Sequence, residues 1–565
     1  MRLLFSAPHF AYFRNFESVI DTLAAQGHYI HLAADEAETF GGQALVERLA
    51  TSHAHVTYGT VPSAADEPWM PFAQKVRYAL DYVRFCAPRY ADIPKLRLRN
   101  VESAPRLVRW LMKGVGVSPV GATLRWLERS MPRSALMRSW LEEFAPDAVI
   151  LTSLTFSRSS AIEQLKAARG LGIPAAAAIM SWDHLSSKAL LHIAPDRTFV
   201  WNEVQKREAV EMHDLPPESI VVTGAQCYDQ WFDRRPSRTR DSFCAEMGLD
   251  IARPFVLYVC SAMSPVPTPV EPQFVKEWVT ALRTAADSRL REVGVLIRPH
   301  PERLKEWTDV SFEGFDNVVV HGGTPIDSTS KADYFDALMF SHAVVGLCTS
   351  AFLEAAIAGR PVLTLLLPAY RMHQDGMAHF RYLLDVEGGL LHAATDMSAH
   401  LRDLAGVLSR SAQRDERNVR FLKAFVRPNG LGVPATPAFV SAVEQLVALS
   451  RKVDPGFAGS TATERVVGWI ARSTRAGVGQ WLMMDAIDVA RARSEEQNDQ
   501  RKQAILEKRT LYVENKARVR QEHVRAREHE QRLKEWAKWR RGLSARKQLA
   551  RIKGGLKQLV GSGQQ

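Results

Sequence analysis

The stretch 343–367, AVVGLCTSAFLEAAIAGRPVLTLLL, predicts a buried strand, a turn, a helix and a second buried strand, in that order. The apolar runs at its two ends are short, partly β-branched and bounded by turn residues, as strands of a parallel sheet are. Thr349 or Ser350 is placed to cap the helix, and Gly359 with Pro361 ends it. The stretch is therefore typical of a βαβ unit in an α/β sheet.

The same stretch places polar groups where a phosphate can bind. The hydroxyl groups of Thr349 and Ser350 and the first N–H groups of the predicted helix lie at the carboxyl end of a strand, and helix N-termini attract anions. Glu354, one turn further along, offers a carboxylate that could accept a ribose hydroxyl. The alternative is an ordinary βαβ unit whose Ser and Thr only cap the helix, and this stretch alone does not separate the two.

A second element upstream favours the functional interpretation. The run VGVLIRPHP is an apolar strand that ends in Arg298 and His300, between prolines that stiffen the loop. Arginine offers a planar fork that suits phosphate oxygens. Loops at the carboxyl ends of neighbouring strands form the ligand crevice of an open α/β sheet. We therefore expect Arg298 and His300 to meet Thr349, Ser350 and Glu354 around one nucleoside diphosphate.

The RPHP element followed by TSAFLEAAIAGRPVLT resembles the donor half of GT-B glycosyltransferases. It is most similar to the group that includes CDP-glycerol glycerophosphotransferases, bacterial Kdo transferases and UDP-GlcNAc 2-epimerases. The resemblance implies a nucleotide-activated donor bound in the second half of the chain. It also implies that no metal is bound, because helix dipoles and basic side chains carry the charge of the leaving diphosphate in such enzymes. The absence of a DxD pair from the donor half fits this expectation.

Composition limits the remaining classes of protein. A chain of 565 residues is too long for one core, and 46% hydrophobic with 24% charged residues is typical of soluble globular proteins. No apolar run approaches the length of a membrane helix, and the N-terminus has no pattern of a cleavable signal. The five cysteines are scattered without CxxC spacing. We therefore expect a reducing cytoplasm and no structural metal.

The first half of the chain opens as a Rossmann-like domain does. A strand over 2–5, a loop and a helix over 13–26 lead into a second strand, although no GxGxxG is present. The resemblance implies that such an acceptor half carries a catalytic residue in its first loop. His9 is therefore a candidate general base and Arg14 a candidate acceptor contact. A His9 that merely caps a turn is the alternative.

A rival for the general base lies further along the first half. A predicted strand runs into Ser-Trp-Asp-His, and a cluster of this kind at the carboxyl end of a strand faces the active-site crevice. Asp183 or His184 could therefore remove the proton from the acceptor. In the second half, the backbone at Ser261 is expected to approach the diphosphate. His379 is expected to contact the base or the sugar, and a surface role is the alternative for it.

Positive charge is concentrated in two segments. Residues 491–565 hold 21 Lys and Arg against 9 Asp and Glu, so this tail carries +12 and the first 490 residues carry −1. Residues 95–133 hold nine basic residues against Glu102 and Glu128, interleaved with leucine and tryptophan. We expect both segments to contact an anionic membrane surface, the tail with its apolar stripe that includes Trp536 and Trp539. A solvated helical hairpin is the alternative for the insert. A nucleic-acid partner, which we disfavour, or a role in oligomerisation is the alternative for the tail.

We therefore expect an α/β protein with a GT-B-like fold, in which two Rossmann-like domains face a cleft and a basic helical extension follows. The expected acceptor domain is 1–225, with a basic helical insert at about 75–135. The expected nucleotide-donor domain is 226–455. Helices over 456–493 are expected to cross back, and 494–565 is the charged tail.

The resemblance implies a metal-independent glycosyltransferase, or a related phospho-polyol transferase, that needs no cofactor. It would move a group from a nucleotide-activated donor to a cell-surface polysaccharide or a lipid-linked acceptor. A non-hydrolysing UDP-sugar 2-epimerase, which shares the donor site and needs no second substrate, is the first alternative. A catalytically silent scaffold is the second. The expected location is the cytoplasm, at the inner face of the cytoplasmic membrane if the tail binds lipid.

Overall fold

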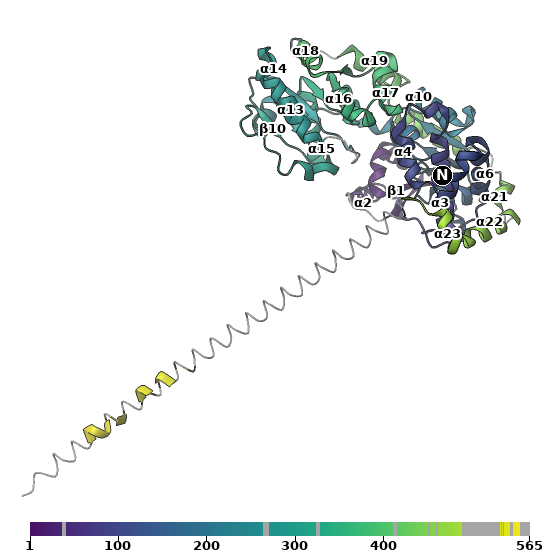
Figure 1. Ribbon diagram of the computed structural model, residues 1–565, viewed down its shortest axis with the longest axis horizontal. Coiled ribbons are helices and arrows are strands. Elements are labelled where there is room, and N and C mark those ends of the chain that lie inside the picture. Colours follow the sequence, from purple (N-terminus) through teal and green to yellow (C-terminus); the bar gives the residue numbers. More distant parts are fainter. Residues whose placement is uncertain are drawn as a thin grey trace, which may run out of the picture. The chain divides into compact units, whose positions relative to one another are not determined.

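The computed structural model is built around two parallel β-sheets, each covered by helices (Figure 1). It describes residues 1–36, 41–263, 270–323, 328–410, 415–449, 452–458, 462–486 and 488, and in the tail 532, 534, 536–538, 540–542, 546, 547 and 549–553. Residues 1–486 form one compact unit and residues 487–565 a second.

The first sheet has seven strands in the order β3-β2-β1-β4-β5-β6-β7. All its neighbouring strands are parallel. The second sheet has six strands in the order β10-β9-β8-β11-β12-β13, again all parallel. The strands are β1 (Arg2–His9), β2 (Tyr29–Glu36), β3 (Val56–Thr60), β4 (Ala148–Leu151), β5 (Ala175–Ala178), β6 (Arg197–Val200), β7 (Ile220–Val222), β8 (Phe255–Val259), β9 (Gly294–Arg298), β10 (Val318–Val320), β11 (Ala343–Val345), β12 (Val362–Leu365) and β13 (His392–Ala394).

Both sheets are doubly wound, and this order decides where a ligand can bind. In each sheet the chain starts near the middle, builds outward to one edge, and then returns to build the other side. The strand order therefore reverses between β1 and β4 in the first sheet and between β8 and β11 in the second. Ligands of open α/β sheets bind at such switch points, outside the carboxyl ends of the strands.

The strands are apolar on both sides because helices cover both faces of each sheet. Leu3 and Phe5 pack into one hydrophobic cluster and Leu4 into another, which is the alternation that a strand imposes. In the second sheet Val256 and Leu257 divide in the same way. This double burial explains why the central strands read as continuous apolar runs.

The helices of the first domain fill the connections between its strands. They are η1 (Phe10–Asn15), α1 (Glu17–Ala25), α2 (Gly42–Ser52), α3 (Met70–Phe85), η2 (Pro88–Tyr90), α4 (Pro94–Ser103), α5 (Arg106–Gly114), α6 (Val117–Arg129), α7 (Ala135–Phe144), α8 (Ala161–Leu171), α9 (His184–Ser187), α10 (Glu203–His213) and η3 (Pro217–Ser219). The helical insert expected at about 75–135 corresponds to α3–α6.

The helices of the second domain follow the same plan. They are η4 (Gln226–Tyr228), α11 (Asp229–Asp233), α12 (Arg240–Met247), α13 (Glu271–Arg283), α14 (Ser288–Glu292), η5 (Pro301–Trp307), α15 (Ser328–Phe340), α16 (Ala351–Ile357), η6 (Pro368–His373), α17 (Ala378–Asp385), η7 (Val386–Gly388), α18 (Met397–Leu408) and α19 (Glu416–Phe425). The βαβ unit β11–α16–β12 lies where the sequence predicts it.

The chain returns to the first domain earlier than the expected boundary at residue 455. Helix α20 (Thr436–Val447) packs against α1 and β6, and Phe439 lies 5.7 Å from Phe16 and 5.2 Å from Phe199 between ring centroids. The two segments that join the domains also pair with each other, since Ala225 N–H donates to Val426 O at 2.9 Å. The first domain therefore consists of 1–225 together with α20 and the helices that follow it.

The last helices of the compact unit continue over the first domain. They are α21 (Pro455–Ala458), α22 (Ala462–Ser473) and α23 (Gly477–Met483). They contact α8, α3 and α5 respectively.

In the tail, the described residues between 532 and 553 are helical, and Trp536 is exposed. Ile552, a further member of the predicted apolar stripe, is also exposed, whereas Trp539 lies outside the described residues. Among the residues that are described, no helix combines the length and the hydropathy that a membrane-spanning segment needs.

Candidate active site

Arg298 ends β9 and is buried, with 7% of its surface exposed. Its Nη1 donates to Asp333 Oδ2 at 3.2 Å, and its Cζ lies 4.8 Å from the centre of the Tyr334 ring. Both partners belong to α15, which precedes the central strand β11. Arg298 is therefore held in one orientation by a carboxylate and an aromatic face.

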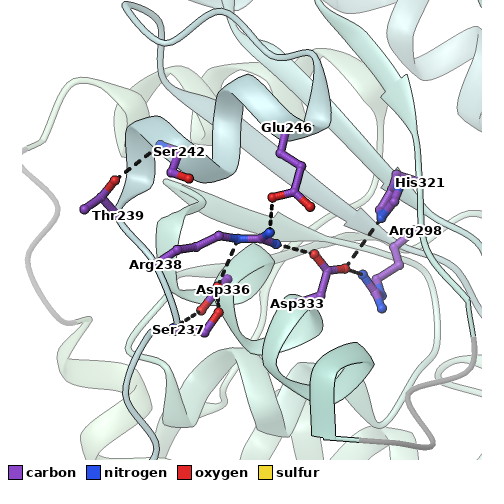
Figure 2. Close-up of polar contacts among 9 residues, drawn as sticks. All are labelled: Ser237, Arg238, Thr239, Ser242, Glu246, Arg298, His321, Asp333 and Asp336. Carbon is purple, nitrogen blue, oxygen red and sulfur yellow. Dashed lines mark hydrogen bonds and ion pairs between the residues drawn. The ribbon is translucent and has the colours of Figure 1, made fainter.

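Asp333 is the centre of a larger charged network (Figure 2). Arg238 Nη2 donates to its Oδ1 at 2.5 Å, and His321 Nε2 lies 3.6 Å from its Oδ2. The hydrogen bond from His321 and the charge of Arg298 lower the pKa of Asp333 to about 2. Asp333 is therefore ionised at neutral pH and fixes the Arg298 guanidinium.

Arg298 also lines an open cavity of about 1080 Å³ at the carboxyl ends of β9 and β10. Gly322 forms part of its wall with φ of +133°, and a Cβ atom there would lie 2.8 Å from Arg298 Cγ. A glycine is thus needed for this loop to approach the arginine. The cavity is lined mainly by polar side chains, among them Ser237, Arg238 and Ser330.

Glu354 is joined to Arg298 through Tyr334. The Tyr334 hydroxyl donates to Glu354 Oε2 at 2.5 Å, while the face of the same ring contacts Arg298. Burial raises the pKa of Glu354 to about 7, against the opposing effects of that hydrogen bond and of the charges on Arg14 and Arg298. Arg14 belongs to η1 of the first domain, so its charge acts on Glu354 from outside the second domain.

The other predicted donor residues lie close to these. Thr349 Oγ1 accepts the N–H of Ala351 at 3.3 Å, so Thr349 rather than Ser350 caps α16 through its side chain. Ser350 is exposed at the start of that helix. His300 Nδ1 accepts the N–H of Glu302 at 3.2 Å and so caps η5.

Ser261 has a different environment from the one that the sequence suggests. Its N–H donates to Glu271 Oε2 at 2.7 Å, and its hydroxyl accepts the N–H of Cys348 at 3.0 Å. These hydrogen bonds link the segment after β8 to the segment after β11, at the switch point of the second sheet. Burial raises the pKa of Glu271 to about 7. The backbone N–H of Ser261 is therefore occupied by a protein carboxylate, and in this structure Ser261 positions the loop.

The candidate bases of the first domain lie along one edge of its sheet. A chain of ring contacts connects them, with centroid distances of 4.4 Å from His9 to Tyr12, 5.8 Å from Tyr12 to Phe156 and 5.3 Å from Phe156 to His184. His9 ends β1 and Phe156 follows β4, so the chain crosses the switch point of the first sheet. The two rival predictions thus concern neighbouring parts of one surface.

Asp183 and His184 have opposite electrostatic environments. Ser181 and Ser187 donate to the two oxygens of Asp183 at 2.6 and 2.8 Å. Burial alone would raise the pKa of the Asp183 carboxyl, but the nearby His184, His379 and Lys188 hold it well below its usual range. Burial lowers the pKa of His184 to about 4. Asp183 is therefore a fixed negative charge and His184 a neutral imidazole.

His379 approaches Asp183 from the second domain. It lies near the start of α17, and its ring stands edge-on to Trp182 at a centroid distance of 5.0 Å. Burial lowers the pKa of His379 to about 4, and Asp183 acts against this effect. The predicted role of His379 toward base or sugar is untested, but its position at the contact between the domains is established.

Sequence reasoning missed several residues of this site. Asp333 and Tyr334 come from a helix that carries no motif, and only their contacts with Arg298 and Glu354 reveal them. Lys95, on α4 of the basic insert, places its Nζ 2.6 Å from Nδ1 of His373 on η6. The insert therefore contributes a cation at the junction with the second domain.

No protein-family model and no curated protein sequence matches the chain. Several solved structures are similar to the chain at low identity. A glycosyltransferase from Rickettsia africae has 10% identity and a TM-score of 0.46, over 80% of this chain and 99% of its own. A UDP-GlcNAc 2-epimerase from Neisseria meningitidis, bound to UDP-GlcNAc, has 12% identity and a TM-score of 0.45, over 79% and 100%. The epimerase of Methanocaldococcus jannaschii has 10% identity and a TM-score of 0.44, over 79% and 99%.

The fold is GT-B-like. Two doubly wound parallel sheets in tandem, with a helical return of the chain to the first, establish this architecture from the structure itself.

Proposed function

We propose that the protein is a transferase that moves a glycosyl group, or a related phospho-polyol, from a nucleotide-activated donor. The acceptor is a cell-surface polysaccharide or a lipid-linked precursor of one. The observation that supports this proposal is the series of contacts in the second domain from Arg298 through Tyr334 to Glu354. A cation, a carboxylate and an open polar cavity at the carboxyl ends of neighbouring strands suit a nucleoside diphosphate.

In this proposal Arg298 stabilises the charge that develops on the leaving diphosphate. Asp333 and Tyr334 hold the guanidinium in place before the donor arrives, so the cation needs little reorganisation during the reaction. Glu354 accepts a hydroxyl of the ribose through the oxygen that Tyr334 does not use. Thr349, Ser350 and His300 line the approach to the phosphates.

The first domain supplies the general base. It must lie within hydrogen-bond reach of the acceptor hydroxyl. His9 remains our first candidate, and Asp183 with His184 is the alternative on the same edge of the sheet. The strongly lowered pKa of Asp183 makes it a poor proton acceptor, so a role for this carboxylate would be to orient a neighbouring group or to stabilise positive charge.

We propose that the reaction needs no resident metal, because arginine and lysine side chains supply the charge that a metal ion would. Activity that persists after exhaustive treatment with a chelator is the expected result. Activity that is lost and then restored by a divalent cation would overturn this part of the proposal.

The test is a screen of nucleotide sugars and nucleotide polyols by thermal shift, followed by product analysis. A ligand held at about 100 times its Kd should add ~2.7 kcal/mol to the apparent stability. Transfer of the group to a glycan acceptor is the expected outcome. An epimerised sugar nucleotide formed without any acceptor would indicate the 2-epimerase instead, and the absence of nucleotide binding would indicate a scaffold.

We further propose that the protein works beside an anionic membrane and that its basic tail contributes to this association. Each Lys or Arg near an anionic leaflet adds about 1 kcal/mol, and salt screens the attraction. A tail of net charge +12 is therefore enough to hold the enzyme near a lipid-linked acceptor at low salt.

A further inference from the structure

Two acidic residues on helices of the first domain, Glu128 and Glu464, point inward. Glu128 on α6 is fully buried, and Arg77 Nη2 and Lys166 Nζ donate to its Oε1 at 2.9 and 2.8 Å. Their charges lower the pKa of Glu128 to about 2, although burial opposes this. Glu128 is one of the two acidic residues that accompany the nine cations of the insert. Its charge is paired with Arg77 and Lys166 in the core. The exposed surface of the insert is therefore more positive than the sequence suggests.

The helices that return to the first domain also have their acidic residues buried and paired. Glu464 on α22 is buried and paired with Arg133, and Asp485, just after α23, is buried and paired with Lys75. On α5, α6, α22 and α23, all of whose residues the structure describes, the acidic residues are Glu128 and Glu464 alone. The outer sides of these four helices thus carry cations without an exposed carboxylate. The exposed cations are Lys113, Arg125, Arg129, Arg465 and Arg472.

Large apolar side chains are exposed among these cations. Trp110 on α5 is 70% exposed, and Val478 and Trp481 on α23 are 75% and 55% exposed. The Arg106 guanidinium lies 5.2 Å from the centre of the Trp481 ring, and the Arg106 N–H donates to Met484 O at 3.2 Å. The two helices are therefore fixed against each other with a tryptophan outward on each.

The four helices are connected by contacts with one another and with α3. Helices α6 and α22 pack on α3, α5 packs on α6, and α23 packs on α5. Residues that are far apart in sequence, around 110 and around 480, are brought together by the return of the chain. We call the outer side of α5, α6, α22 and α23 the tryptophan face.

We propose that the tryptophan face docks on an anionic lipid bilayer. Tryptophan places an apolar ring and a polar N–H at the level of the headgroups, and Arg and Lys on the same helices attract anionic lipid. The sorting of charge favours this occupant, since a protein partner of mixed charge would bring cations that no exposed carboxylate of these four helices could match. This inference deepens the proposed function by naming the surface that brings the acceptor domain to a lipid-linked substrate. It rests on residues before 487 and so is independent of the tail.

The test uses full-length protein and vesicles of phosphatidylglycerol and phosphatidylcholine in equal amounts. Trp110→Ser and Trp481→Ser are combined, both in the natural chain and in a chain that carries Trp536→Ser, so that the tail cannot mask the effect. The bound fraction is measured by co-sedimentation at low and high salt. We expect the salt-resistant binding to fall at least about tenfold, which corresponds to ~1.4 kcal/mol. Lys113→Gln with Arg125→Gln should instead weaken the salt-sensitive binding.

The matched control is Tyr29→Ser, which removes an exposed aromatic ring from another part of the first domain. It should leave vesicle binding unchanged, and all variants should keep the thermal shift given by nucleotide. Salt-resistant binding that survives the double tryptophan variant would overturn the inference. A dimer that dissociates on the same substitutions, or binding to single-stranded nucleic acid that they abolish, would assign the face to that partner. Neither result depends on whether the protein transfers sugar.

Discussion

Replacing Arg298 by alanine is expected to weaken nucleotide binding far more than it weakens the fold. The guanidinium makes one hydrogen bond to Asp333 and stacks on Tyr334. Asp333 keeps its contacts with Arg238 and His321 when Arg298 is removed, so no buried carboxylate is left alone. A hydrogen bond between a charged group and a diphosphate contributes roughly 1.5–3 kcal/mol. The Kd should therefore rise by a factor of roughly 10 to 150.

Isothermal titration with a nucleoside diphosphate measures this change, and thermal unfolding of the free protein checks the fold. Arg253→Ala is the matched control, because Arg253 is an arginine of the same domain whose contacts with Asp250 and Asp316 lie at the surface. It should leave the Kd unchanged. A folded Arg298→Ala protein with the Kd of the natural chain would refute the assignment of Arg298 to the diphosphate.

Three further predictions follow from the same geometry. Glu354→Gln should weaken binding of ribonucleotides and leave binding of 2′-deoxyribonucleotides nearly unchanged. An equal effect on both would show that Glu354 does not bind the 2′-hydroxyl of the ribose. Either His9→Ala or Asp183→Ala should abolish turnover while nucleotide affinity is kept, whereas turnover that survives in both would leave the base unassigned. Glu271→Gln should flatten the pH dependence of stability, measured by thermal unfolding between about pH 4.5 and 7. Burial raises the pKa of Glu271 to about 7 from an ordinary value of 4.5, so the folded state holds the extra proton in this range and loses stability as the pH rises. An unchanged slope in Glu271→Gln would contradict this reasoning.

The sequence predicts the central elements of this fold well, because their signals are local. The strands β11 and β12 and the helix α16 lie within the run 343–367, and their apolar patterns, caps and turn residues are adjacent in the chain. The predicted helix over 13–26 was less accurate. It is divided into η1 and α1 at Phe16, whose ring is buried against Phe439 of a helix more than four hundred residues later. No local pattern contains that contact.

The residues of the candidate site also fall into two groups, those with a local signal in the sequence and those without one. Arg298 and Glu354 could be found because each follows an apolar strand in a recognisable motif. Tyr334, which connects them, lies on α15, a helix that carries no motif of its own. The position of Ser261 could not be predicted, because its partner Glu271 lies beyond a proline-rich segment, and its buried carboxylate gives no pattern in the sequence. The inward direction of Glu128 and Glu464 is likewise visible only in three dimensions.

The early return of the chain has a consequence for synthesis on the ribosome. The first domain is interrupted, since α20 supplies the residues that cover Phe16 and Phe199, and α20 is made only after the whole second domain. At the usual 5–20 residues per second, the roughly 210 residues between the two parts take about 10–40 s to be translated. During this time the apolar side of the first sheet lacks the part of its cover that α20 supplies, whereas the second domain is continuous in sequence and can fold as soon as it emerges. The second domain can therefore finish folding before the first domain does. The incompletely covered first sheet is where we expect a chaperone to bind.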